Sequence, residues 1–315
     1  MNKPRYLIAS DFDGTLFDTS KPSPSGMTVQ RAYAQSLDDL FGKKTGESFF
    51  SINDFHGEAP SQIIQNVLRT RDKSLIDNAK KVHGEQNGNF PRLIPESKDG
   101  MILWNPEDPQ VTLTSMLVIR KLGYLLQETG TRDQDGNPWP LPCEGVLDFL
   151  RTLESLKEKG APIDLAIISS GHESFIRKAL KFWDIPQPDI LITEDDVRTR
   201  KFPQEAETKF KPGVFPIALA HFVWLRNQGL TFSEEIGLNT RTRIMHIGDN
   251  YTKDIVMAEK AGIMSNFLFP ATSWMFIAET LTNNKSLLDG RPFEEILKPQ
   301  LVGVEGFKGR RIERI

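Results

Sequence analysis

The chain has almost no cysteine and no long hydrophobic run, and these absences exclude several classes of protein. Cys143 is the single cysteine among 315 residues, so the chain cannot form an intramolecular disulfide or a cysteine-rich zinc site. No apolar run approaches the roughly 18 residues that a membrane-spanning helix needs, and the apolar residues after Arg5 are too few for a signal peptide. We therefore expect a cytoplasmic protein with no membrane partner.

The chain also lacks an excess of charge of either sign. It carries 39 Lys and Arg against 42 Asp and Glu, a formal net charge of −3. Nucleic-acid binding depends on positive charge gathered against phosphates, so this balance predicts no nucleic-acid partner. With 38% hydrophobic residues the chain can bury a substantial core, and its length is enough for two domains or one domain with a large insertion.

Short apolar runs have the length and composition of buried strands. They lie at 6–10, 164–169, 189–193 and 243–248, with a fifth candidate at 266–269. Segments of helical periodicity separate them, and two apolar stripes consist of Val146, Phe149, Leu150, Leu153 and Leu156, and of Val214, Ile217, Leu219 and Leu225. This alternation predicts an α/β fold with a doubly wound, mostly parallel, Rossmann-like sheet, whose functional residues follow the carboxyl ends of the strands.

The segment from Thr19 to Leu141 contains no convincing buried strand. Apolar spacing predicts helices near 29–41, 63–68 and 113–125, while 72–109 has no assignable pattern. Proline- and glycine-rich stretches bound the segment at both ends. We therefore predict a mostly helical domain at 19–141, inserted into a core of residues 1–18 and 142–315, of which 286–315 form a C-terminal extension without a clear pattern.

Acidic residues follow two of the predicted strands. Asp11 and Asp13 come directly after the first strand, Asp249 directly after the fourth, and Asp254 five positions later. Carboxylates this close together repel unless a cation lies between them, and oxygen ligands of this kind suit Mg²⁺. A lone Asp-x-Asp is often ordinary surface polarity, but the second acidic pair at the same sheet edge favours a magnesium site.

Residues suited to binding a phosphoryl group accompany these carboxylates. Ser169 and Ser170 precede a predicted helix, where backbone N–H groups favour an anion, and Lys211 supplies a positive charge. For His172 two interpretations stay open, a substrate contact or a surface residue at the start of a helix. His246 lies inside a predicted strand and is expected to be a packed core residue.

The order of these motifs resembles that of the haloacid dehalogenase (HAD) superfamily. Asp11–Thr15 resembles its Asp-x-Asp-Gly-Thr motif, Ser169 its strand-end serine, Lys211 its lysine, and Gly248–Asp254 its Gly-Asp-x-x-x-x-Asp motif. The Lys-Pro arrangement of the family favours Lys211 over Lys209 as that lysine. The match covers the core up to about residue 270, and the helical insertion resembles the family's C1-type cap.

The resemblance implies a mechanism for phosphoryl transfer. Asp11 would be the nucleophile that forms an aspartyl-phosphate, and Asp13 would protonate the leaving oxygen and then deprotonate the attacking water. Mg²⁺ would be held by the carboxylates of Asp11 and Asp249 and by the main-chain carbonyl of Asp13, with Asp254 supporting the metal shell. The groups implied to bind the transferring phosphoryl are Ser169, Ser170 and Lys211.

Several activities occur in this superfamily, and the sequence discriminates among some of them. The dehalogenase branch lacks the second aspartate of the first motif, so Asp13 favours phosphoryl transfer. A phosphomutase shares every core motif and stays open as an alternative, as does a non-catalytic phosphate-binding module. We predict a magnesium-dependent phosphomonoester hydrolase that acts on a small phosphorylated metabolite, with no oligomeric state indicated.

Overall fold

The computed structural model describes residues 4–42, 60–69, 109–199, 210–231, 233–270 and 273–283, together with 288, 290–293, 295 and 296. Residues 72–108 of the unassigned segment 72–109, the rival Lys209, and residues 297–315 of the C-terminal extension lie outside these described residues. Within the described residues, no helix combines the length and the apolar character needed to cross a bilayer.

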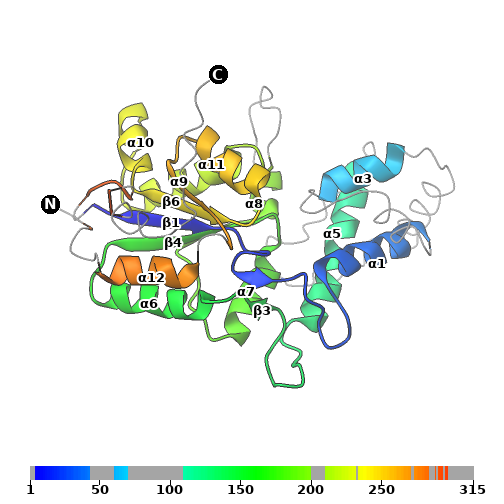
Figure 1. Cartoon of the computed structure of the whole chain (residues 1–315). Helices are drawn as coiled ribbons and strands as arrows, with labels where there is room; N and C mark the ends of the chain where they lie inside the picture. Colours follow the sequence, from blue (N-terminus) through cyan, green and yellow to red (C-terminus); the bar gives the residue numbers. More distant parts are fainter. Residues whose placement is uncertain are drawn as a thin grey trace.

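A five-stranded parallel sheet forms the centre of the molecule (Figure 1). Its strands are β1 (Tyr6–Ser10), β4 (Ile163–Ile168), β5 (Ile190–Ile192), β6 (Ile244–Gly248) and β7 (Ser265–Leu268), in the order β5-β4-β1-β6-β7. These are the five predicted strands, each within one residue at either end. The chain places β4 and β5 on one side of β1, and β6 and β7 on the other, so the strand order reverses at β1. In sheets of this kind ligands bind beyond the carboxyl ends of the strands at such a reversal.

Helices cover both faces of this sheet (Figure 1). Tyr6 and Ile8 of β1 point into one hydrophobic cluster, whereas Leu7 and Ala9 point into the other, as the alternation of side chains along a strand requires. The first cluster packs against α6 (Val146–Glu158), α7 (Glu173–Phe182) and α12 (Trp274–Asn283). The second packs against α8 (Glu194–Thr199), α9 (Phe215–Asn227), α10 (Glu234–Arg241) and α11 (Val256–Lys260).

The predicted apolar stripes are buried, with one exception. All five stripe residues of α6 are buried, as are Ile217, Leu219 and Leu225 of α9. Val214 was predicted to begin the second stripe, but it precedes α9 and is 38% exposed. Farther along the chain, Phe293 and Ile296 belong to the first cluster, so the described start of the C-terminal extension packs against the core.

Three helices lie beside the sheet and share a hydrophobic cluster of their own (Figure 1). This three-helix group consists of α1 (Val29–Phe41), α3 (Pro60–Arg69) and α5 (Pro109–Glu128), which correspond to the three helices predicted in the insertion. Thr28 begins α1 because its hydroxyl accepts a hydrogen bond from the backbone N–H of Arg31 at 3.0 Å. The chain leaves and re-enters the core at adjacent points, because β2 (Phe17–Asp18) pairs with β3 (Leu141–Pro142).

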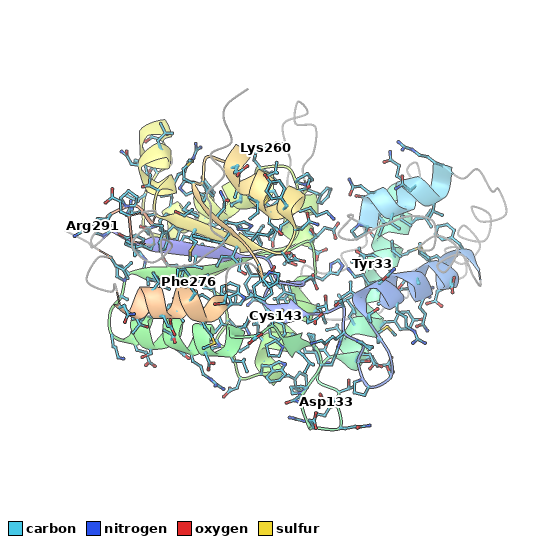
Figure 2. The ribbon with its side chains drawn as sticks, viewed as in Figure 1. Tyr33, Asp133, Cys143, Lys260, Phe276 and Arg291 are labelled. Atoms are coloured by element: carbon cyan, nitrogen blue, oxygen red, sulfur yellow. The ribbon has the colours of Figure 1, made fainter. Side chains whose placement is uncertain are left out.

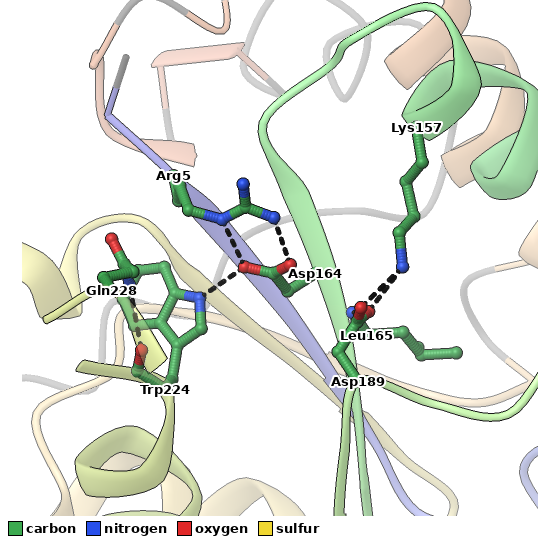
Figure 3. Close-up of polar contacts among 7 residues, drawn as sticks. All are labelled: Arg5, Lys157, Asp164, Leu165, Asp189, Trp224 and Gln228. Carbon is green, nitrogen blue, oxygen red and sulfur yellow. Dashed lines mark hydrogen bonds and ion pairs between the residues drawn. The ribbon is translucent and has the colours of Figure 1, made fainter. Parts of the chain in front are cut away.

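Paired charges hold the amino ends of the strands together (Figure 3). Asp164 of β4 forms two hydrogen bonds with the guanidinium of Arg5, which precedes β1, and accepts a third from Trp224 Nε1 of α9 at 2.9 Å. Asp189 pairs with Lys157 Nζ at 2.6 Å and accepts the backbone N–H of Leu165 at 2.8 Å. These contacts connect β1, β4 and two helices at the edge opposite the carboxyl ends of the strands.

Candidate active site

Three predicted acidic residues meet at the carboxyl edge of the sheet. Asp11 follows β1, Asp249 follows β6, and Asp254 lies on the π-helical turn Tyr251–Ile255 that comes next. One carboxylate oxygen from each lies within 4.8 Å of the others, an arrangement that can hold a metal ion. Asp254 is buried, Asp11 is half-buried and Asp249 is exposed, so the group opens to solvent at Asp249.

Lys211 joins two of these carboxylates. Its Nζ lies 2.9 Å from Asp11 Oδ1 and 2.6 Å from Asp254 Oδ1, and the lysine is buried. Burial alone would lower the pKa of Lys211, but the charges of Asp11 and Asp254 outweigh it and raise that pKa above its ordinary value. Lys211 is therefore a fixed positive charge between β1 and the turn after β6.

The group holds more negative charge than one lysine neutralises. Burial raises the pKa of Asp11, and although Lys211 opposes this shift, the carboxylates of Asp254 and Asp13 add to it. Burial and Asp254 likewise raise the pKa of Asp249. Because a divalent cation would offset this repulsion, and because carboxylate oxygens are the ligands that Mg²⁺ prefers, the residues present fit a magnesium ion.

Two glycines allow the carboxylates to approach the backbone. Gly14 has a φ of +75°, and a Cβ on it would lie 2.5 Å from Asp249 Oδ2. A Cβ on Gly248 would lie 2.2 Å from Cγ of Asp254, which no real contact allows. A side chain at either position would therefore displace an acidic residue of the site.

Asp13 and Ser169 flank the backbone of Gly171. A Cβ on Gly171 would lie 3.0 Å from Ser169 Oγ and 3.4 Å from Asp13 Oδ2. Ser169 Oγ accepts the backbone N–H of Gly171 at 2.8 Å, and Asp13 Oδ1 accepts a hydrogen bond from the hydroxyl of Thr19 at 2.8 Å. Ser169 therefore lies near Asp13 of the Asp-x-Asp-Gly-Thr motif. Ser170, the next residue, is half-buried.

His172 is a buried residue, which excludes the surface interpretation. Its side chain is fully enclosed at the start of α7, with Nδ1 3.0 Å from Asp195 Oδ2 and 3.9 Å from Glu194 Oε2. His246 is buried in β6 as predicted, with Nε2 3.7 Å from Asp254 Oδ1, and burial lowers its pKa. The two histidines therefore contact different acidic residues.

The motifs read from the sequence do not include the residues that surround His172. Glu194 and Asp195 begin α8, one residue after the end of β5, so the rule that assigns function to strand ends could have found them. Lys121 of α5 and Tyr33 of α1 lie in the three-helix group, and Figure 2 shows Tyr33 on its side nearest the sheet. Nζ of Lys121 lies 3.5 Å from His172 Nε2 and 3.9 Å from the ring centroid of Tyr33. No motif marks these two residues.

No family model and no curated protein sequence matches the chain. Among solved structures, it is similar to CbbY from Rhodobacter sphaeroides in complex with phosphate, at 14% identity and a TM-score of 0.45, over 85% of this chain and 88% of that one. It is also similar to a HAD phosphatase from Thermococcus onnurineus, at 14% identity and a TM-score of 0.40, over 85% and 87% of the two chains. The chain is also similar to a HAD-superfamily hydrolase from Ehrlichia chaffeensis, at 17% identity and a TM-score of 0.36, over 90% of this chain and 98% of that one.

Proposed function

We propose that the chain is a cytoplasmic, magnesium-dependent phosphatase of the HAD type, which hydrolyses a small phosphorylated metabolite through an aspartyl-phosphate on Asp11. The observation that carries this proposal is the excess of carboxylates around Asp11 and Lys211, close to the carboxyl end of β1. Perturbed carboxylates that gather around one buried cation are characteristic of catalytic sites.

Asp11 is suited to act as the nucleophile. Lys211 holds its Oδ1 at 2.9 Å, which orients the carboxylate and leaves Oδ2 to attack phosphorus. After the attack, the P–O bond to the leaving group breaks and the phosphoryl group is carried on Asp11. Water then attacks this acyl phosphate, releases inorganic phosphate and restores the carboxylate.

Asp13 is suited to move the proton in both steps. Thr19 donates to its Oδ1, which fixes the carboxyl group, and Oδ2 lies on the side of Gly171 and Ser169. As an acid, Asp13 gives its proton to the leaving oxygen, and as a base it accepts a proton from the attacking water. Ser169, the N–H groups after it at Ser170 and Gly171, and Lys211 would hold the phosphoryl oxygens.

The metal ligands of this proposal are the carboxylates of Asp11 and Asp249 and the main-chain carbonyl of Asp13. Both oxygens of Asp254 have protein partners, because Oδ1 pairs with Lys211 and Oδ2 accepts the backbone N–H of Asn250 at 3.1 Å. This supports a role for Asp254 in orienting the metal shell rather than in direct ligation. When bound, Mg²⁺ supplies positive charge that stabilises the transferring phosphoryl group.

The three-helix group is suited to act as a cap over this site. It belongs to the segment 19–141, which we propose as a domain separate from the core of residues 1–18 and 142–315. The paired strands β2 and β3 would form the hinge between them. A cap of this kind would exclude bulk water and limit the size of the substrate.

The direct test is release of inorganic phosphate from a panel of phosphorylated metabolites in the presence of Mg²⁺. We expect hydrolysis that stops on addition of EDTA and that is lost in Asp11→Asn. Asp164→Asn is the matched control, because it neutralises an aspartate at the opposite edge of the same sheet. Turnover that persists in Asp11→Asn, or isomerisation of a sugar phosphate without phosphate release, would contradict the proposal.

A further inference from the structure

His246 is a buried polar residue whose ring nitrogens form no hydrogen bond. Its side chain is 0% exposed, and neither Nδ1 nor Nε2 has a hydrogen-bond partner in the part of the chain that the structure describes. Ile244, which points to the same face of the sheet, and Ala9, which pairs with His246 from β1, are both apolar. An apolar side chain at position 246 would suit this core, and a buried imidazole without hydrogen bonds lowers stability. A residue kept in spite of this calls for a role other than packing.

The carboxylate of Asp254 lies beside the ring of His246. Nε2 is 3.7 Å from Asp254 Oδ1, just beyond hydrogen-bond distance. Burial lowers the pKa of His246, so the imidazole is neutral at pH 7 and carries one N–H donor. Because a carboxylate only accepts hydrogen bonds, this contact favours the tautomer with the proton on Nε2. A displacement of about half an ångström would complete the hydrogen bond.

Oδ1 of Asp254 can accept this donor in addition to the one it already has. It pairs with Lys211 Nζ at 2.6 Å, while Oδ2 accepts the backbone N–H of Asn250 at 3.1 Å. A carboxylate oxygen has two lone pairs, so Lys211 and His246 can share Oδ1. The two donors belong to different segments, because His246 lies in β6 and Lys211 precedes α9. Together with Asn250 they would fix the orientation of the carboxylate.

The orientation of Asp254 matters because it determines the position of Lys211. Lys211 Nζ contacts Asp11 Oδ1 at 2.9 Å as well as Asp254. In the proposed reaction the phosphoryl group becomes bonded to Asp11, and the carboxyl group of the resulting acyl phosphate no longer carries a negative charge. Of the two carboxylates that contact Lys211, Asp254 alone then keeps its charge and holds the ammonium beside the phosphoryl group.

We propose that His246 is a positioning residue of the active site, whose Nε2–H donates to Asp254 Oδ1 and keeps this carboxylate aligned with Lys211 while Asp11 carries the phosphoryl group. This inference rests on the proposed phosphatase function, to which it adds a residue outside the motifs. His246 touches neither substrate nor metal in this assignment and acts through Asp254. A buried imidazole that lowers stability and supports the reaction is an instance of the conflict between stability and activity at functional sites.

Substitution of His246 should change activity and stability in different directions. His246→Leu removes the donor, so kcat for 4-nitrophenyl phosphate with Mg²⁺ should fall about tenfold with little change in KM. The melting temperature of this variant should be equal or higher, because a buried imidazole without hydrogen bonds is lost. His246→Gln places an amide N–H at a similar reach and should retain most of the activity. An unchanged kcat in His246→Leu, or an equal loss of kcat in His246→Gln, would overturn the proposal.

His221→Leu is the matched control for loss of a buried histidine. His221 of α9 is buried, and its Nε2 lies 2.7 Å from Thr240 Oγ1 of α10, so this imidazole already has a hydrogen-bond partner. The contact joins two helices away from the carboxylates of the site. Its loss should lower the melting temperature by about 1–4 °C and leave kcat within about twofold. The same loss of kcat in His221→Leu as in His246→Leu would contradict the assignment.

The dependence of His246 on Asp254 is tested by combining substitutions. In an Asp254→Asn background, His246→Leu should lower kcat by no more than about twofold, because His246 acts through the charged carboxylate. The tenfold effect expected in the otherwise unsubstituted enzyme should therefore largely disappear. A tenfold effect that persists in the Asp254→Asn background would show that His246 acts by another route and refute the proposal.

NMR of the full chain labelled with ¹⁵N-histidine measures the contact without turnover. His246, assigned from its missing signals in His246→Gln, should carry its proton on Nε2, and Asp254→Asn should move that proton signal upfield because the charged acceptor is lost. A proton on Nδ1, or a signal that Asp254→Asn does not move, would contradict the contact. Full phosphate release by His246→Leu would refute this inference and leave the phosphatase proposal standing. No phosphate release by the unsubstituted protein would overturn the phosphatase proposal, and the NMR result would still decide whether His246 donates to Asp254.

Discussion

Aspartates at the two ends of the central sheet have different electrostatic surroundings. At the amino ends, Asp164 has Arg5 and Trp224 as partners, and Asp189 has Lys157 and a backbone N–H (Figure 3). Each of these carboxylates therefore has a positive charge of its own and further donors. Such pairs connect strands and helices, and their hydrogen bonds contribute to stability.

At the carboxyl ends, several carboxylates share a single cation. Asp11 and Asp254 both pair with Lys211, whereas Asp249 and Asp13 form no ion pair with a lysine or arginine among the described residues. Burial raises the pKa of Asp11, so ionising this carboxyl group in the folded protein lowers the free energy of unfolding. Perturbed charge of this kind is typical of catalytic sites and supports the proposed role of the carboxyl edge, whereas the compensated charge at the amino edge connects elements of the fold.

The largest effects are expected from substituting the carboxyl-edge aspartates that differ in proposed role. Asp13→Ala should lower kcat by about 10²- to 10⁴-fold with little change in the Mg²⁺ concentration that gives half-maximal activity. Asp249→Ala should instead raise that Mg²⁺ concentration strongly, because a direct ligand is lost. Activity titrations with Mg²⁺ separate the two results. Equal loss of metal affinity in both variants would contradict the distinction between acid and ligand.

A smaller effect is expected at the amino edge. Asp164→Asn removes the charge-assisted bonds to Arg5, which is partly solvent-exposed, so we expect a loss of about 1–2 kcal/mol in the free energy of unfolding. Urea denaturation measures this loss, and kcat/KM measured below the unfolding transition should stay within about twofold of the unsubstituted enzyme. A fall in kcat/KM comparable to that of Asp13→Ala would break the contrast between the two edges.

The smallest effect is expected from Asp11→Asn in the presence of EDTA. Unlike Asp164→Asn, this substitution should not lower the free energy of unfolding. The pKa of Asp11 is raised by folding, so ionised Asp11 lowers stability at pH values above its unfolded value of 3.8. At pH 7 the variant should therefore be equally stable or more stable, by up to about 1 kcal/mol. The difference should shrink as the pH falls toward 4. If calorimetric melting showed Asp11→Asn to be clearly less stable, this would contradict the claim that the carboxylates around Lys211 carry excess negative charge.

The sequence predicted the strands and which residues follow them at one edge of the sheet, for a physical reason. Strands buried on both faces are continuous apolar runs, and a parallel sheet brings whatever follows them to one edge. Asp11, Ser169 and Asp249 are therefore near one another by topology alone. Glu194 and Asp195 after β5 followed the same rule and were overlooked because no familiar motif includes them.

Contacts that depend on the packing of the three-helix group could not be predicted. Lys121 and His172 are separated by 51 residues, and an apolar stripe indicates that α5 has a buried face but not which element covers it. A lysine within such a helix is ordinarily solvent-exposed, so its burial beside His172 has no sequence signal. Val214 was misplaced for a related reason, because helical periodicity does not fix the first residue of a helix.

Identification of the phosphorylated residue during turnover tests the central claim most directly. Asp13→Ala is the useful background, because it lacks the base for hydrolysis of the intermediate, and an activated aryl phosphate needs no acid for its leaving group. Acid quenching followed by peptide mass mapping should find the phosphoryl group on Asp11 in the presence of Mg²⁺, and none in Asp11→Asn. A phosphoryl group on another residue, or phosphate release by the unsubstituted enzyme without any adduct on Asp11 in Asp13→Ala, would contradict the account.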